Sequence, residues 1–260
     1  MLCPLVKLPM QSIIQDRQLV LACHITGIYD INRSNTLPND DYSLVENWAD
    51  SITKQGMQGI IFHNNFSEAT CKKFTNNHIQ FIHIAHNTKF NPNVYRYYIY
   101  NQFITQYAAS IKSIFVTDIA DVVIQNNPFT QLIFLKNYDS LFCGDEPSTL
   151  KNDWMQAHST HLREQIADYA SYEADYKDNT LLNCGIIGGN IQVMQPFIQQ
   201  LWAIHQQYNA NNAYAYTGDM GAFNYLVRTK FNDNLLHGSP INSVFKTYDI
   251  SNTTCWFKHK

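Results

Sequence analysis

The segment Ser113-Ile-Phe-Val-Thr-Asp118-Ile-Ala-Asp121-Val-Val-Ile-Gln-Asn-Asn-Pro128-Phe129 joins a strongly apolar run to two carboxylates. Residues 114–116 have the unbroken apolar character of a buried central strand, and residues 122–124 form a second short apolar piece. The Asn-Asn-Pro that follows predicts the turn that ends it. The pattern therefore places Asp118 and Asp121 at the carboxyl end of a buried strand.

Two carboxylates in this position offer hard oxygen ligands of the kind that Mg²⁺ and Mn²⁺ prefer. A cation held between them would neutralise a diphosphate as it becomes a leaving group. Because aspartate is also common in turns after strands, the alternative is that both side chains only accept hydrogen bonds from nearby backbone amides. The segment therefore predicts a metal site or, in its absence, a capped turn.

The composition is that of a folded globule. Of the 260 residues, 45% are hydrophobic and 15% are charged, which excludes a disordered chain and fits one large domain. The net charge of -3 provides no basic field for a nucleic-acid backbone, so we expect no nucleic-acid partner. The six cysteines contain no Cys-x-x-Cys pair, which favours free, mostly buried thiols in a reducing compartment.

Neither a secretion signal nor a membrane anchor is predicted. Residues 1–17 lack a clean apolar core and a small-residue cleavage site, and no stretch approaches about 18 uninterrupted apolar residues. We therefore expect no transmembrane segment and a cytoplasmic location in a bacterium or virus. A truncated chain, or an effector secreted by a specialised system, would share these sequence features.

Apolar runs alternate with amphipathic stretches along the chain. The expected strands are residues 19–26, 59–63, 79–84, 114–116 and 139–143. The expected helices are residues 41–54, 67–76, 94–112, 154–176 and 195–208, the second of them capped by Ser67. The βαβαβ order of the first half predicts a single Rossmann-like α/β domain, with a mainly parallel central sheet flanked by helices.

Two segments of the second half combine glycines with polar side chains. Leu182-Asn-Cys-Gly-Ile-Ile-Gly-Gly-Asn190 would let the backbone approach a ligand closely around Asn183 and Gly185, although by itself it predicts a turn before a helix. Thr217-Gly-Asp-Met-Gly-Ala-Phe-Asn224 places Asp219 at the start of a helix, where it would cap the helix or complement its dipole. Taken alone, the first segment favours a structural role, whereas Asp219 fits a structural and a functional role equally well.

In their order along the chain, these segments resemble those of nucleotide-sugar glycosyltransferases with the GT-A fold. The Asp118 segment is similar to the Asp-x-Asp region in its "VTDxxDVVxxxNPF" form, residues 183–189 resemble an "NxGxxGG" segment, and Asp219 resembles a carboxylate that precedes "xxAFN". The resemblance covers about residues 19–260 and implies a single GT-A-like domain. About residues 19–125 would form its nucleotide-sugar-binding half, and about residues 126–260 its acceptor-binding half.

The resemblance implies a metal-dependent enzyme that moves a sugar from a nucleotide-diphosphate donor, a UDP-sugar, to a hydroxyl of a carbohydrate, lipid or protein acceptor. The cation would be Mn²⁺ or Mg²⁺, held by Asp118 and Asp121. This chain departs from the commonest motif because Ala120 takes the position of the second carboxylate, so Asp121 must reach the cation from one residue later. The third ligand would be His237, in a His-Gly-x-Pro segment, or His259, near the C-terminus.

The same resemblance implies roles around the two substrates. Asp219 would orient the acceptor or act as a base. The implied donor-binding residues are Thr26, Arg96, Asp118, Asn183, Gly185, Lys246 and Lys260. Arg96 fits a structural ion pair equally well. The aromatic side chains that offer faces for sugar stacking, or otherwise belong to the core, are Trp154, Tyr214, Tyr216 and Trp256.

Two other classes of function fit parts of the pattern. A phosphotransferase or phosphatase would use Asp118 as a nucleophile. A catalytically inactive module would keep the fold and bind carbohydrate or nucleotide without turnover, as the missing carboxylate at Ala120 suggests. Hydrolysis of a donor with Mn²⁺ separates an enzyme from such a module, and a trapped phosphoryl-aspartate would identify the phosphotransferase.

Overall fold

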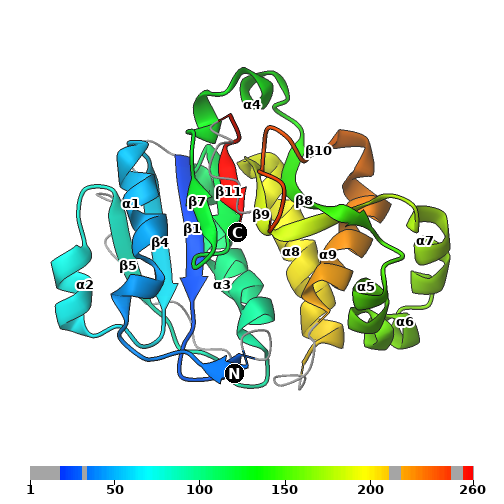
Figure 1. Cartoon of the computed structure of the whole chain (residues 1–260), viewed down its shortest axis with the longest axis horizontal. Coiled ribbons are helices and arrows are strands. Elements are labelled where there is room, and N and C mark those ends of the chain that lie inside the picture. Colours follow the sequence, from blue (N-terminus) through cyan, green and yellow to red (C-terminus); the bar gives the residue numbers. More distant parts are fainter. Residues whose placement is uncertain (1–17, 31–33, 211–217, 247–253, 260) are drawn as a thin grey trace.

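The computed structural model describes residues 18–30, 34–210, 218–246 and 254–259, and Figure 1 shows a central sheet with helices on both faces. The sheet has seven strands in the order β10-β8-β9-β6-β1-β4-β5. The bounds of these strands are β1 (Gln18–His24), β4 (Gln58–His63), β5 (Ile79–His83), β6 (Ser113–Thr117), β8 (Leu141–Thr149), β9 (Thr180–Asn190) and β10 (Leu235–His237).

Most neighbouring strands run parallel. β1 pairs in parallel with β4 and with β6, β4 with β5, and β8 with β10. β9 is antiparallel to both of its neighbours, β6 and β8. The predicted α/β fold with a mainly parallel central sheet is therefore confirmed, and the one sheet joins strands from both predicted halves of the chain.

Helices connect the strands and cover the sheet. Their bounds are α1 (Glu46–Lys54), α2 (Glu68–Phe74), α3 (Pro92–Tyr107), α4 (Leu132–Lys136), α5 (Asp153–His158), α6 (Thr160–Gln165), α7 (Tyr169–Tyr176), α8 (Ile191–Tyr208) and α9 (Asp219–Leu226). A π-helical turn, Val227–Phe231, follows α9 directly. The helical stretch predicted over residues 154–176 is three short helices rather than one. In the described ranges, no helix combines the length and apolar character needed to cross a membrane.

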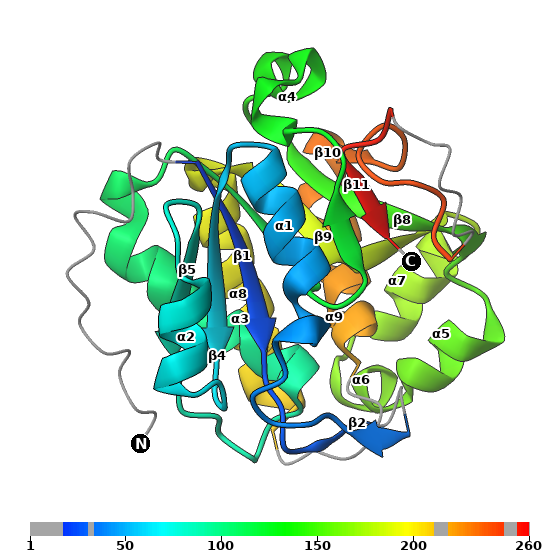
Figure 2. The ribbon, with the colours of Figure 1, turned by 60° about the vertical axis from the view of Figure 1, so that its left-hand side comes forward.

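The two faces of the sheet build two cores, because side chains alternate along a strand. Leu19 and Leu21 of β1 lie in the core that includes apolar side chains of α3, α8 and α9. Val20 and Ala22 lie in the other core, with Trp48 of α1. Figure 2 shows α1 on one side of β1, and α3 and α8 on the other. The unbroken apolar character of this strand follows from its burial on both faces.

The segment around Asn183 and Gly185 is a strand, so the predicted turn is wrong. It lies within β9, between β6 and β8. A Cβ on Gly188 would lie only 2.2 Å from the ring of Phe115 on β6, so this glycine makes room for an aromatic side chain of the neighbouring strand. Glycines in a strand interior often mark such a close approach, and the local sequence does not reveal which neighbour makes it.

Two short ribbons lie outside the main sheet. β7 (Val122–Ile124) pairs antiparallel with β11 (Phe257–His259), and β2 (Tyr29–Asp30) pairs with β3 (Asn35–Thr36). The β7–β11 ribbon carries the C-terminal strand back to the segment that follows β6. This return decides which side chains surround the predicted metal site.

Candidate functional site

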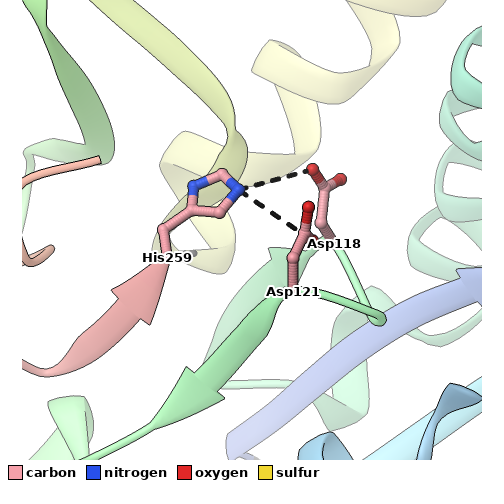
Figure 3. A group of neighbouring side chains, drawn as sticks. All are labelled: Asp118, Asp121 and His259. Atoms are coloured by element: carbon pink, nitrogen blue, oxygen red, sulfur yellow. Dashed lines mark ion pairs between the residues drawn. The ribbon is translucent and has the colours of Figure 1, made fainter. Parts of the chain in front are cut away.

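Three side chains from two distant segments meet where β6 ends, as Figure 3 shows. Asp118 directly follows β6, and Asp121 directly precedes β7. In the β7–β11 ribbon, His259 stands opposite Val122, the neighbour of Asp121. Antiparallel pairing therefore brings a C-terminal histidine to the two aspartates, at the edge of the sheet where α/β proteins commonly bind ligands.

The donor atoms of these three residues are spaced for a shared cation rather than for direct hydrogen bonds. His259 Nε2 lies 3.8 Å from Asp118 Oδ2 and 4.0 Å from Asp121 Oδ1. One ligand atom from each residue lies within 4.8 Å of the other two. Two ligands that each bind a cation at about 2.1 Å lie about 3.0 to 4.2 Å apart, depending on the angle between them. The two distances from His259 fall inside this range.

The imidazole of His259 is suited to bind a metal. Its side chain is 2% exposed, whereas those of Asp118 and Asp121 are 30% and 38% exposed. Burial lowers the pKa of His259 below its ordinary value, although the nearby Asp118 carboxylate acts to raise it. The ring of Phe245 packs against the imidazole with centroids 4.6 Å apart. A neutral imidazole with two carboxylates accepts Mn²⁺ more readily than Mg²⁺, which prefers oxygen ligands alone.

Gly185 of β9 keeps the space between the donor atoms open. A Cβ there would lie 2.5 Å from the His259 ring and 2.7 Å from Asp118 Oδ2. The carbonyl of Gly185 accepts a hydrogen bond from the Asp118 N–H at 2.8 Å, which fixes the beginning of the loop after β6. The absence of a side chain at Gly185 therefore leaves the three donor atoms room for an ion, whereas the predicted close approach of its backbone to a ligand stays a prediction.

Arg96 of α3 forms an ion pair with the other oxygen of Asp118, Oδ1. The guanidinium is buried and also donates a hydrogen bond to Tyr97 Oη at 3.2 Å. Burial acts to lower the pKa of Arg96, but the Asp118 carboxylate raises it well above its usual value, so the side chain stays charged. Asp118 thus contacts Arg96 through Oδ1 and faces His259 through Oδ2.

Asp219 is the first residue of α9, and Gly218 rather than Asp219 occupies the cap position. Asp219 Oδ1 lies 2.9 Å from His158 Nε2, and Oδ2 lies 3.8 Å from Arg96 Nη2. Burial acts to raise the pKa of Asp219, but the hydrogen bond and charge of His158, together with Arg96, hold it well below its ordinary range. Asp219 is therefore an ionised carboxylate held between two nitrogen groups.

A cleft of about 940 Å³ opens beside these residues. The predicted site residues that line it are Arg96, Asp118, Asp121, Asn183, Gly185, Asp219, Lys246 and His259. Lys246 is exposed to solvent, in contrast to the buried Arg96. Residues from six separate segments of the sequence therefore surround one cavity.

Glu146 of β8 also lines the cleft, although it is not among the residues predicted from the sequence. Its Oε1 accepts a hydrogen bond from Asn183 Nδ2 at 2.7 Å. Burial raises the pKa of Glu146 above its ordinary value, although the bond from Asn183 acts to lower it. The available signal was the acid pair at residues 145–146, but the strand was predicted to end at residue 143, whereas β8 continues to Thr149.

Two of the predicted residues lie apart from the cluster. His237 Nδ1 is 2.9 Å from Asp145 Oδ2, and neither residue lines the cleft. Thr26 is buried, its hydroxyl donates to Asn39 Oδ1 at 3.2 Å, and it does not line the cleft either. Of the two histidines proposed as the third ligand, the structure brings His259 to the aspartates. Lys260 lies outside the described residues.

The four aromatic residues named as stacking candidates lie in different environments or outside the described residues. Trp256 is 1% exposed and belongs to the core, whereas Trp154 is 43% exposed and lines the cleft. Tyr214 and Tyr216 lie outside the described residues. Trp154 is therefore the stacking candidate that the structure places in the cleft.

A comparison of this chain with protein-family models and with curated proteins found no match. The function must therefore be inferred from the chemistry of the site. That chemistry combines a carboxylate–carboxylate–imidazole cluster spaced for a divalent cation, two basic side chains and a separate ionised aspartate, all around one cleft.

Proposed function

We propose that this protein is a metal-dependent glycosyltransferase that moves a sugar from a nucleotide-diphosphate donor, a UDP-sugar, to an acceptor hydroxyl. The observation that carries the proposal is the meeting of Asp118, Asp121 and His259 at the carboxyl edge of a mainly parallel sheet, beside a cleft. An ion held there would lie where a diphosphate in the cleft can reach it. If the aspartates only capped a turn, there would be no reason for a histidine and a cleft to lie beside them.

The cluster and the basic side chains together suit a diphosphate leaving group. Bound by Asp118 Oδ2, Asp121 and His259, Mn²⁺ or Mg²⁺ would neutralise the charge that develops on the diphosphate as its bond to the sugar breaks. Arg96 holds Asp118 by its other oxygen, which fixes the orientation of that carboxylate. Lys246 is exposed at the cleft and would supply a second positive charge to the donor.

The cleft has the size and the further polar groups that this reaction needs. Small-molecule sites commonly have volumes of about 300 to 1,000 Å³, and this cleft has about 940 Å³. Asp219 lines it together with the cluster. Because the pKa of Asp219 is held well below its ordinary range, its carboxylate is a weak base. We therefore assign Asp219 the orientation of the acceptor hydroxyl rather than the removal of its proton.

The test is release of free nucleotide from a panel of UDP-, GDP- and CMP-sugars, with and without Mn²⁺, by the wild type and by Asp118→Asn. We expect Mn²⁺-dependent release from a UDP-sugar, and a decrease of about a hundredfold or more in the variant, because Asp118 is a proposed metal ligand. The matched control is Asp145→Asn, an aspartate outside the cleft lining, which should retain the release rate. Thermal unfolding of both variants checks that they are folded.

The other outcomes are equally informative. Binding of a UDP-sugar without release would show an inactive binding module instead of an enzyme. A phosphoryl group trapped on Asp118 would show a phosphotransferase. If neither binding nor release occurs with any nucleotide sugar, the proposed function is wrong.

A further inference from the structure

Trp154 differs from the other tryptophans of the chain by its exposure. Its side chain lies on α5, is 43% exposed and lines the cleft. The three others are buried, with exposures of 0% for Trp48, 6% for Trp202 and 1% for Trp256. An aromatic side chain that is exposed inside a cleft offers apolar surface that a ligand can cover.

The indole of Trp154 is also fixed in place. It stacks on the imidazole of His158, with ring centroids 4.5 Å apart and planes inclined by 19°. His158 is itself 5% exposed, and its Nε2 lies 2.9 Å from Asp219 Oδ1. The indole is thus connected through one buried side chain to a carboxylate of the proposed reaction site. A pre-oriented aromatic ring loses little conformational entropy when a ligand binds to it.

The segment that leads into α5 is held as firmly as the indole. Asn152 caps the helix by accepting a hydrogen bond from the Met155 N–H at 2.8 Å, and its amide donates to Ser148 Oγ at 3.1 Å and to the Thr149 carbonyl at 2.7 Å. These bonds connect the end of β8 to the beginning of the helix. Trp154 therefore projects from a well-supported turn.

Three polar side chains close to Trp154 in the sequence also line the cleft. Glu146, Ser148 and Asn152 precede it in the chain and line the same cavity. A pyranose ring presents an apolar face of C–H groups and a rim of hydroxyls, so it suits an exposed indole surrounded by carboxylate, hydroxyl and amide groups. These polar groups suit a sugar ring better than a lipid chain, which would leave them without hydrogen-bond partners.

We propose that the part of the cleft beside Trp154 is a binding subsite for a hexopyranose ring, with the ring stacked on the indole and its hydroxyls bonded to the neighbouring polar groups. The subsite lies next to Asp219, the residue assigned to orient the acceptor. It follows that the acceptor is a carbohydrate rather than a lipid or a protein. The assignment of this ring to the acceptor rests on the proposed function, whereas the binding of a sugar ring beside Trp154 does not depend on it.

Fluorescence tests the subsite without metal, donor or turnover. Acrylamide should quench the emission of Trp154 more than that of the buried tryptophans. We expect at least one of lactose, maltose, cellobiose and N,N′-diacetylchitobiose, at millimolar concentration, to reduce this quenching in the wild type, and none to do so in Trp154→Phe. The subsite is refuted if no disaccharide protects the wild type, or if the protection persists in the variant.

A transfer assay tests its role. With the protecting disaccharide as acceptor, Trp154→Ala should raise the acceptor KM about tenfold, and Trp154→Phe should raise it less because a ring remains. Tyr138→Ala removes another exposed aromatic, outside the cleft lining, and should leave KM unchanged. An unchanged KM in Trp154→Ala, or transfer only to a lipid or a protein, would overturn the proposal.

The two proposals fail in distinguishable ways. If no nucleotide sugar releases its nucleotide but a disaccharide still protects Trp154, the proposed reaction is wrong and the sugar subsite stands. If nucleotide release occurs and no disaccharide protects Trp154, the reaction stands and the subsite is wrong.

Discussion

Two histidine–aspartate arrangements of this chain differ in spacing and burial. His237 Nδ1 lies 2.9 Å from Asp145 Oδ2, and the two side chains are 28% and 25% exposed. His259 Nε2 lies 3.8 Å from Asp118 and 4.0 Å from Asp121, beyond hydrogen-bond distance, and its side chain is 2% exposed. The first arrangement is a closed pair, and the second is an open cluster of three.

The difference indicates which of the two arrangements could hold a metal ion. The pair of His237 and Asp145 forms a direct hydrogen bond and needs no further group. The cluster around His259 leaves donor atoms from three residues facing a common space, which Gly185 keeps free of side chains. Proximity of a histidine to an aspartate is therefore a weaker indication of a metal site than an open space shared by donor atoms of three residues.

The largest effect should come from filling that space. In Gly185→Ala, the new Cβ would lie 2.5 Å from the His259 ring, so the donor atoms must move apart. We expect Mn²⁺ affinity, measured by calorimetry or by electron paramagnetic resonance, to fall by about a hundredfold or more. The control is Gly144→Ala, whose Cβ would meet its nearest neighbour at an ordinary 3.6 Å and should leave affinity unchanged. Wild-type affinity in Gly185→Ala would exclude a metal site at this cluster.

Replacing each of the two histidines with glutamine, in separate variants, tests the comparison directly. His259→Gln removes the buried imidazole, and we expect the dissociation constant for Mn²⁺ to rise by about 10- to 100-fold. His237→Gln disturbs only the partly exposed pair with Asp145, so the same constant should stay within about twofold. The comparison fails if His237→Gln weakens Mn²⁺ binding as much as His259→Gln does.

His205 of α8 adds a third case to the comparison of His237 with His259, because its ring forms a hydrogen bond with an amide rather than with a carboxylate. Its Nδ1 lies 2.7 Å from Asn209 Nδ2, and burial lowers the pKa of His205 from 6.5 to about 3. Between these values the unfolded chain binds a proton that the folded chain does not. The contribution of neutral His205 to the free energy of unfolding is therefore fully present above about pH 6.5. Below that pH the free energy of unfolding decreases by about 1.4 kcal/mol for each pH unit.

Urea unfolding at pH 7 and at pH 5.5 measures this loss of stability. His205→Gln should lose less stability between the two pH values than the wild type does, because the variant lacks the titrating group. Equal losses in the two proteins would show that the protonation of His205 does not contribute. His63 has a pKa lowered to about 4 by burial and acts in the same direction, but it is common to both proteins and cancels in the difference.

The predictable parts of this protein are those that local sequence governs. Residues 19–26, 59–63 and 79–84 predicted strands that the structure has as β1, β4 and β5, because each is an apolar run bounded by polar residues. Ser67 predicted the beginning of α2, since its hydroxyl accepts a hydrogen bond from the Thr70 N–H within the same turn. The parallel order followed from the alternation of these strands with helices.

The parts that were missed depend on neighbours distant in sequence. The glycines of β9 were predicted to form a turn. Gly188 is instead explained by the ring of Phe115, which belongs to another strand and cannot be recognised as a neighbour from the local sequence. Glu146 was overlooked because β8 runs beyond its apolar beginning, where pairing with β9 and not hydrophobicity sustains the strand. His158 did not stand out as a site residue, since its partner Asp219 comes from α9.

The sequence by itself determined the α/β architecture and the placement of Asp118 and Asp121 after a central strand, because strand periodicity and turn preferences act over a few residues. Only the tertiary structure decided that His259 joins the aspartates while His237 pairs with Asp145. That choice depends on the pairing of β11 with β7 and of β10 with β8, which are contacts between segments far apart in the chain. Spacing within a sequence carries no information on such contacts, whereas the geometry of donor atoms does.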